Sequence, residues 1–274
     1  MKKRIAMLLV AALVLSLLSA CAGSSKEKHT LAITTIETTQ IYNDKDIKIT
    51  LTDFNTTMMG VELAITIENA SPKNIILTSN HFVVNGITIS GGCFIEISAG
   101  QTCNDTMYLY SASLKDAAIT SVATIRGMDC TITDSDTFEV VDGFTFDLVT
   151  SVGADYQQPI SKDGDVLLDT GGFQVISQPF THDAYGEVTR LLMVNNSTQA
   201  FIVQAKDVKI DGKPVDGKLS DAIYPNSVRY SDLGLYSSDI DNGTIKKITF
   251  KLVIIDQATG VAVMETKELV ISTD

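Results

Sequence analysis

The sequence predicts an all-β protein made of two tandem immunoglobulin-like β-sandwiches. Three observations predict this fold: one unit occurs twice, apolar residues alternate with polar ones over short segments, and turn residues recur between those segments. Val, Ile and Thr are abundant and Trp is absent, which favours strands. Short strands with a turn roughly every 8–12 residues are typical of a β-sandwich. The sequence shows no helices long enough for βαβ units, which excludes a doubly wound sheet.

The repeat becomes visible when the chain is aligned with itself at an offset of 126 residues. No gap is needed between residue 40 and about residue 125. Turn residues meet turn residues, and apolar positions meet apolar positions. The aligned pairs are Phe54 with Phe180, Gly60 with Gly186, Asn69 with Asn195, Ser71 with Ser197, Ile76 with Ile202, Gly86 with Gly212, Tyr110 with Tyr236 and Ile119 with Ile245.

The first copy gives the clearest strand pattern. Residues 60–68 alternate apolar and polar side chains, as expected for a half-buried antiparallel strand. Asn85-Gly86 and Asp211-Gly212 are tight-hairpin signals at matching places, because both turn residues need a positive φ. The remaining expected strands are 40–43, 47–54, 75–77, 82–87, one that ends at 107–110, 119–132 and a last one after 137. A capped helical turn is expected at 111–116 and again at 237–240.

The repeat sets the expected boundaries. The first sandwich covers residues 38–150 and the second covers 164–274. Residues 151–163 form a linker that contains Gly153 and Pro159. Residues 21–37 are rich in Ser, Thr and Lys, which indicates a flexible stalk.

Residues 1–20 have the composition of a secretory signal peptide: a basic head, an apolar stretch and small residues at the end. The stretch from Ile5 to Leu18 is shorter than the roughly 20 residues that span a bilayer. Leu18-Ser19-Ala20-Cys21 resembles the lipobox of bacterial lipoproteins. That resemblance implies cleavage before Cys21 and a diacylglyceryl group on its thiol. Two acyl chains anchor a protein stably, so we expect a lipid-anchored protein at the extracellular face of the cell membrane. An ordinary signal peptide cut nearby is the alternative.

Five motifs carry a wider resemblance: Ile-Glu-Asn-Ala-Ser, Val-Asn-Gly, Ser-Ala-Gly, Tyr-Ser-x-Ser-Leu and Asp-Ser-Asp-Thr, which begin at residues 67, 84, 98, 110 and 134. Together they are similar to clostridial-type lipoproteins of unassigned function, which are regarded as immunoglobulin-like. The resemblance implies a Gram-positive membrane. Its motifs are turn and core positions, so it implies no catalytic residue.

The charge balance restricts the partners. Without Lys2, Lys3 and Arg4, 18 basic residues remain against 33 acidic ones, a formal charge of −15. Nucleic acid requires clustered Lys and Arg, so no nucleic-acid partner is expected. Attraction to an anionic surface through charge is excluded as well, which leaves the lipid on Cys21 as the contact with the membrane.

Few residues suggest chemistry. Cys93 and Cys103 flank a predicted hairpin and either pair as a disulfide or, like Cys130, are small apolar residues. Asp134 and Asp136 lie in a turn that either binds Ca²⁺ or is a solvated turn whose carboxylates accept backbone hydrogen bonds.

The remaining candidates favour structural roles. His29, His81 and His182 lack metal-ligand spacing, and we interpret His81 and His182 as surface or turn residues. Tyr110 and Tyr236 recur at one place, where a hydroxyl that ties down a strand end is the favoured role over ligand binding.

These residues favour a non-enzymatic interaction or spacer module with an unknown ligand. No catalytic residue, metal site or cofactor is expected, since the nucleophile, phosphate-loop and dinucleotide motifs are absent from the sequence. A carbohydrate- or cell-wall-binding module is the first alternative, although such sites use exposed aromatic platforms. A metal-dependent enzyme is the second.

Overall fold

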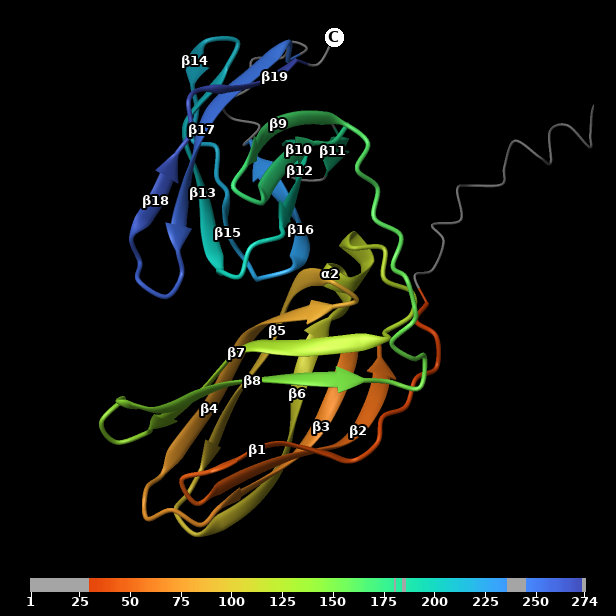
Figure 1. Cartoon of the computed structure of the whole chain (residues 1–274), viewed down its shortest axis with the longest axis vertical. Helices are drawn as coiled ribbons and strands as arrows, with labels where there is room; N and C mark the ends of the chain where they lie inside the picture. The colour runs from red at the N-terminus through yellow and green to blue at the C-terminus, as the bar shows by residue number, and fades with distance from the viewer. Residues whose placement is uncertain (1–29, 180, 184–185, 236–244, 273–274) are drawn as a thin grey trace, which may run out of the picture. The chain divides into compact units, whose positions relative to one another are not determined.

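The computed structural model describes residues 30–179, 181–183, 186–235 and 245–272 (Figure 1). Strands account for most of this part of the chain, and the only helix described is the short α2 at Ser111–Asp116. The predicted all-β sandwich fold is therefore confirmed. No described helix is long and apolar enough to cross a membrane.

The first half contains eight strands in two sheets. One sheet has the order β1-β2-β3-β6, and the other has the order β5-β4-β7-β8. β5 pairs along its length with β4 and crosses to β6 at Gly91 and Gly92. The strands are β1 (Thr39–Asp44), β2 (Ile47–Thr57), β3 (Gly60–Asn69), β4 (Ile75–Val84), β5 (Ile87–Ile97), β6 (Gln101–Tyr110), β7 (Thr124–Asp134) and β8 (Val140–Val149).

The second half repeats this order. β9-β10-β12-β16 form one sheet, with β11 on β12, and β13-β17 form the centre of the other, flanked by β14, β15, β18 and β19. β3 and β12, and likewise β4 and β13, have the same length and begin 126 residues apart. The strands are β9 (Asp165–Thr170), β10 (Phe173–Ser177), β11 (Thr181–Asp183), β12 (Gly186–Asn195), β13 (Phe201–Ile210), β14 (Lys213–Pro214), β15 (Ser220–Ile223), β16 (Ser227–Gly234), β17 (Lys247–Asp256), β18 (Ala262–Glu265) and β19 (Leu269–Ser272).

Both predicted tight hairpins are present. Asn85 has φ 50° and Gly86 φ 81°, and Asp211 has φ 49° and Gly212 φ 84°. These values are those of a type I′ turn, which matches the right-handed twist of the strands it joins. The turns join β4 to β5 and β13 to β14.

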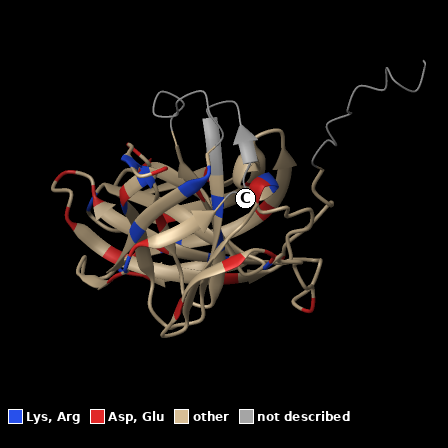
Figure 2. Ribbon diagram, turned by 90° about the horizontal axis from the view of Figure 1, so that it is seen from above, with Lys and Arg blue, Asp and Glu red and all other residues tan. Residues whose placement is uncertain are grey.

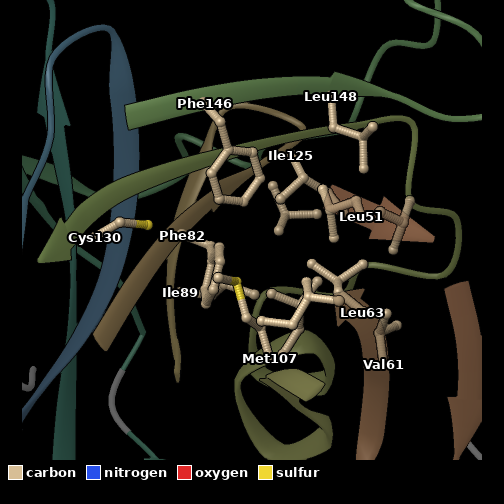
Figure 3. Packing of buried hydrophobic residues seen from close by; sticks show 14 of the residues in the cluster. Leu51, Val61, Leu63, Phe82, Ile89, Met107, Ile125, Cys130, Phe146 and Leu148 are labelled. Atoms are coloured by element: carbon tan, nitrogen blue, oxygen red, sulfur yellow. The ribbon is translucent and has the colours of Figure 1, made fainter. Parts of the chain in front are cut away.

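Each half has its own apolar core. In the first, inward side chains of the two sheets interdigitate, and the rings of Phe82 and Phe146 meet edge to face with centroids 6.4 Å apart (Figure 3). A second cluster lies among residues Phe173–Ile271. Four second-half residues on the other face of their sheet join the first cluster: Ile176, Leu192, Val194 and Val228.

The halves also touch through polar contacts. Ile87 of β5 bridges to Val228 of β16, and the hydroxyls of Thr88 and Ser227 lie 2.8 Å apart. Leu31–Asp274 forms one compact unit by its contacts. Residues 150–164, which include the expected linker, contain no helix or strand.

Four local predictions were wrong. The segments 75–77 and 82–87 are not separate strands, because β4 runs from Ile75 to Val84. The strand expected from 119 begins only at Thr124, since Ala118 takes φ 51° and an irregular buried segment follows it. The helical turn forms without a side-chain cap, because Tyr110 occupies the N-cap position. Its expected counterpart at 237–240 lies outside the described residues.

The fourth difference concerns the expected stalk. Leu31 and Ile36 pack against the first core. The backbone N–H of Ala32 donates to the carbonyl of Thr120 at 2.8 Å, and that of Thr35 donates to the hydroxyl of Ser151 at 3.0 Å. Residues 31–36 therefore line the first sandwich, held by the packing of Leu31 and Ile36 and by these two hydrogen bonds.

Candidate functional site

Cys21 lies outside the described residues, so its lipidation stays a prediction. Cys93, Cys103 and Cys130 are free thiols. In the strand register, Cys93 of β5 lies opposite Ser79 of β4. Cys103 of β6 lies opposite Ile67 of β3, in the other sheet. Of the two alternatives left open, the structure thus has the unbridged one. Burial raises the pKa of the Cys93 and Cys130 thiols to about 12, so both stay protonated and unreactive at neutral pH.

The repeated Asn and Ser form a buried hydrogen-bond network. Asn69 Nδ2 donates to the carbonyls of Lys73 at 2.8 Å, Ser98 at 3.1 Å and Ile97 at 3.3 Å. Asn69 Oδ1 accepts from the N–H and the hydroxyl of Ser71, at 3.1 and 2.6 Å. The network fastens the end of β3 to the turns that follow β3 and β5.

The second copy builds the same network 126 residues later. Asn195 Nδ2 donates to the carbonyls of Gln199 at 2.8 Å and Tyr224 at 3.1 Å. Asn195 Oδ1 accepts from the N–H and hydroxyl of Ser197 at 3.0 and 2.7 Å. Asn195 is fully buried. The matching Asn and Ser residues are therefore structural, and their recurrence reflects the fold.

The acidic turn at Asp134 is structural as well. Asp134 Oδ1 accepts from the N–H groups of Asp136 at 3.0 Å and Thr137 at 3.3 Å, and its Oδ2 lies 2.8 Å from Lys73 Nζ. The Lys73 hydrogen bond and these N–H groups lower the pKa of Asp134. In the second copy Asp256 accepts from the N–H and hydroxyl of Thr259 in the same way. Of the two alternatives, the turn whose carboxylate accepts backbone hydrogen bonds is the one observed.

His81 is 24% exposed but is not a turn residue, so the turn interpretation was wrong. It lies within β4 at a register shift, and its Nδ1 is 2.9 Å from Asp129 Oδ2. Asp129 Oδ1 accepts from the N–H groups of Asn80 at 3.1 Å and His81 at 3.0 Å. Burial alone would raise the pKa of Asp129, but these hydrogen bonds outweigh it and hold that pKa below its usual value.

The second copy has an ion pair at the matching place. Asp207 follows His81 by 126 residues and lies at the matching register shift of β13. Its Oδ2 is 2.9 Å from Nζ of Lys251. Ile75 faces Asp134 and Phe201 faces Asp256, so the second copy is four residues shorter before this point, and Lys251 corresponds to Asp129. Each copy thus joins β4 to β7, or β13 to β17, by a polar side-chain contact at this irregularity. That recurrence assigns His81 and Asp129 a structural role.

Tyr224 extends the His81–Asp129 pair into the second half. Its hydroxyl donates to Asp129 Oδ2 at 3.0 Å and accepts from Nε2 of Gln257 at 3.2 Å. Its ring is buried, and it packs with Val83 in a small apolar cluster. Burial, more than the neighbouring carboxylate, raises the pKa of Tyr224, so the hydroxyl stays protonated. No pattern in the sequence indicated this contact, since its partners are far apart along the chain.

A polar cleft of about 320 Å³ lies beside these contacts, between β5, α2 and β16. Three aspartates line it: Asp116, Asp221 and Asp232. Asp221 pairs with the buried Arg229, and Asp232 Oδ1 lies 2.9 Å from Arg190 Nε. Since arginines neutralise two of the three carboxylates, the cleft holds no pair of buried acids that would act as acid and base.

The other candidates do not assemble into a site. His29 and Tyr236 lie outside the described residues, and His182 is in β11. Within the described ranges, no group of three His, Cys, Asp or Glu is placed to hold a metal ion. Tyr110 is 45% exposed, and its hydroxyl bonds to none of the described residues, so the expected tie to a strand end is not found there.

The fold and these contacts define an all-β sandwich protein with paired structural networks. No protein-family profile matches the chain, and no curated protein matches it. Among solved structures, the crystal structure of red sea bream transglutaminase is similar over 88% of this chain, with 7% sequence identity and a TM-score of 0.22. The match covers 31% of that chain. A likeness this weak carries no argument about fold or activity.

Proposed function

We propose that this chain is a lipoprotein of the Gram-positive cell membrane, anchored by lipid on Cys21 and exposed outside the cell. In this proposal its two sandwiches form a non-enzymatic interaction or spacer module. The leader sequence supports the anchor, because a basic head, a short apolar stretch and Leu-Ser-Ala-Cys follow one another at residues 1–21.

One observation carries the non-enzymatic part of the proposal. The polar groups of Asn69, His81 and Asp134 each have a counterpart in the second copy that makes a corresponding structural contact. Residues of a catalytic site would lack such structural counterparts in the other copy. On sandwich folds, binding uses exposed loops and sheet faces instead.

The anchor is tested by Cys21→Ala. We expect this variant to stay unprocessed or to be released into the medium, whereas the wild type sediments with membranes. Cys103→Ala is the matched control, because it removes a half-exposed thiol that serves no anchor. Normal processing and full membrane retention of Cys21→Ala would rule out the anchor.

The interaction role is tested by crosslinking on intact cells, followed by pulldown of the lipidated protein. We expect a wall or membrane partner that is enriched over the Cys21→Ala sample. Failure to recover one from cells that retain the protein at the surface would count against a binding role and leave the spacer role.

Exposed aromatic rings bear on the carbohydrate alternative. The ring contacts found among the described residues, such as Tyr42 with Phe144 and Phe173 with Phe201, involve buried or half-buried rings. No contact between two exposed rings is found in this part of the chain, so no observation favours a carbohydrate platform there.

A further inference from the structure

The turn between β2 and β3 exposes two large apolar side chains. Met58 is 95% exposed and Met59 is 67% exposed. Residues 54–61 carry no charge, although a fifth of the chain is charged and acidic residues predominate. Figure 2 shows Asp and Glu spread over the described strands and turns, with Lys and Arg between them. A neutral, apolar turn on such a surface is typical of a contact site.

Backbone hydrogen bonds place this turn at a definite end of the first sandwich. The N–H of Ser111, the first residue of α2, donates to the carbonyl of Met59 at 2.8 Å. In the segment after α2, the carbonyl of Thr120 accepts a hydrogen bond from the N–H of Ala32, also at 2.8 Å. The Met58–Met59 turn, α2 and the N-terminal segment at Ala32 therefore gather at one end. Ile33 is 96% exposed beside Ala32.

Chain length ties this end to the membrane if the proposed anchor holds. Ala32 follows Cys21 by eleven residues, which span at most about 40 Å when fully extended. A lipid on Cys21 therefore keeps the Ala32 end within that distance of the bilayer. The opposite end of the sandwich, at Asn69, is separated from the Met58–Met59 turn by the ten residues of β3, about 30 Å.

We propose that the Met58–Met59 turn inserts into the interfacial region of the bilayer that holds the Cys21 lipid, as a second membrane contact. Met side chains are flexible and apolar and adapt to an irregular environment. The lack of charge lets the turn approach anionic headgroups that repel the rest of this acidic protein. The contact fixes how the first sandwich stands on the membrane. This inference rests on the proposed lipid anchor.

The absence of Trp from the chain provides a direct test. Met58→Trp and Phe138→Trp each place a single tryptophan at an exposed position. Phe138 is 76% exposed and lies in the β7–β8 turn, whose Ser135 N–H donates to the carbonyl of Asn74 near the Asn69 end. The lipidated full chain is reconstituted in vesicles of phosphatidylcholine and phosphatidylglycerol, with and without acyl-chain bromination.

We expect the Met58→Trp emission to shift to shorter wavelength and to be quenched by brominated lipid. Phe138→Trp should show neither change. A double Met58→Ser, Met59→Ser variant should keep the wild-type circular dichroism spectrum and transfer faster between vesicles than Phe138→Ser does. The tryptophan at position 58 reports the contact of this turn with the bilayer, and the double serine variant removes that apolar contact.

The outcomes separate this inference from the anchor itself. Protein that does not float with vesicles contradicts the lipid anchor. Protein that floats while Met58→Trp stays unshifted and unquenched overturns the membrane contact. A blue shift that brominated lipid does not quench, and that grows with protein density, also overturns it and assigns the turn to a contact with a second copy.

Discussion

The buried asparagine of each copy offers the sharpest test of the repeated framework. Asn195→Ala removes two hydrogen bonds donated to carbonyls and two accepted from Ser197. Both carbonyl groups that lose the Asn195 amide keep another donor in the variant. The Ser227 hydroxyl donates to the carbonyl of Tyr224, and the Ser197 hydroxyl donates to the carbonyl of Gln199. Since a net hydrogen bond contributes about 0.5–1.5 kcal/mol and an unsatisfied buried group costs about 1–3 kcal/mol, we expect a loss of about 2–4 kcal/mol.

Asn69→Ala should cost a similar amount, because Asn69 makes the matching bonds and is 1% exposed. The assay is urea unfolding of the purified protein, followed by far-ultraviolet circular dichroism. Asn104→Ala is the control. It loses an exposed hydrogen bond with Thr66 and should change the free energy of unfolding by less than about 0.5 kcal/mol. The reasoning is refuted if either buried variant is as stable as the control, or if only one of the two is destabilised.

Three further predictions follow from the remaining contacts. Tyr224→Phe removes the hydroxyl that joins the two halves and should lower the free energy of unfolding by about 1–2 kcal/mol in urea titrations. Cys103 should be alkylated by iodoacetamide at pH 8 in the folded protein, while Cys93 and Cys130, whose thiol pKa burial raises to about 12, should react only after unfolding. The pKa of Asp134 is lowered by folding, so its stabilising effect is complete above about pH 4, its usual pKa, and is lost as the pH falls toward the folded value. Asp134→Asn should therefore flatten the acid limb of the stability profile, and an unchanged limb would contradict this assignment.

Local patterns predicted the strands well. Period-two alternation located β3 to within one residue, and Asn85-Gly86 located the hairpin after β4. These signals are local, because a half-buried strand needs alternation and a tight turn needs residues that tolerate positive φ. The repeat also related residues that are far apart in the sequence, since a residue in one copy has the same place in the fold as the equivalent residue in the other copy.

Contacts between distant residues were beyond the sequence patterns. His81, Asp129 and Tyr224 meet because β4, β7 and the second half pack together, and no spacing along the chain encodes that. One signal was available: aligning the repeat past its four-residue difference pairs Asp129 with Lys251, opposite Asp207. The packing of residues 31–36 was missed for a related reason, since Leu31, Ile33 and Ile36 show no sustained two-residue alternation.

Mass spectrometry of the N-terminal peptide, on protein taken from its native membrane, tests the proposed lipid on Cys21. We predict a mature chain that begins at Cys21 and carries the mass of a diacylglyceryl group on that residue. A chain that begins elsewhere, or that retains an unmodified Cys21, would contradict it.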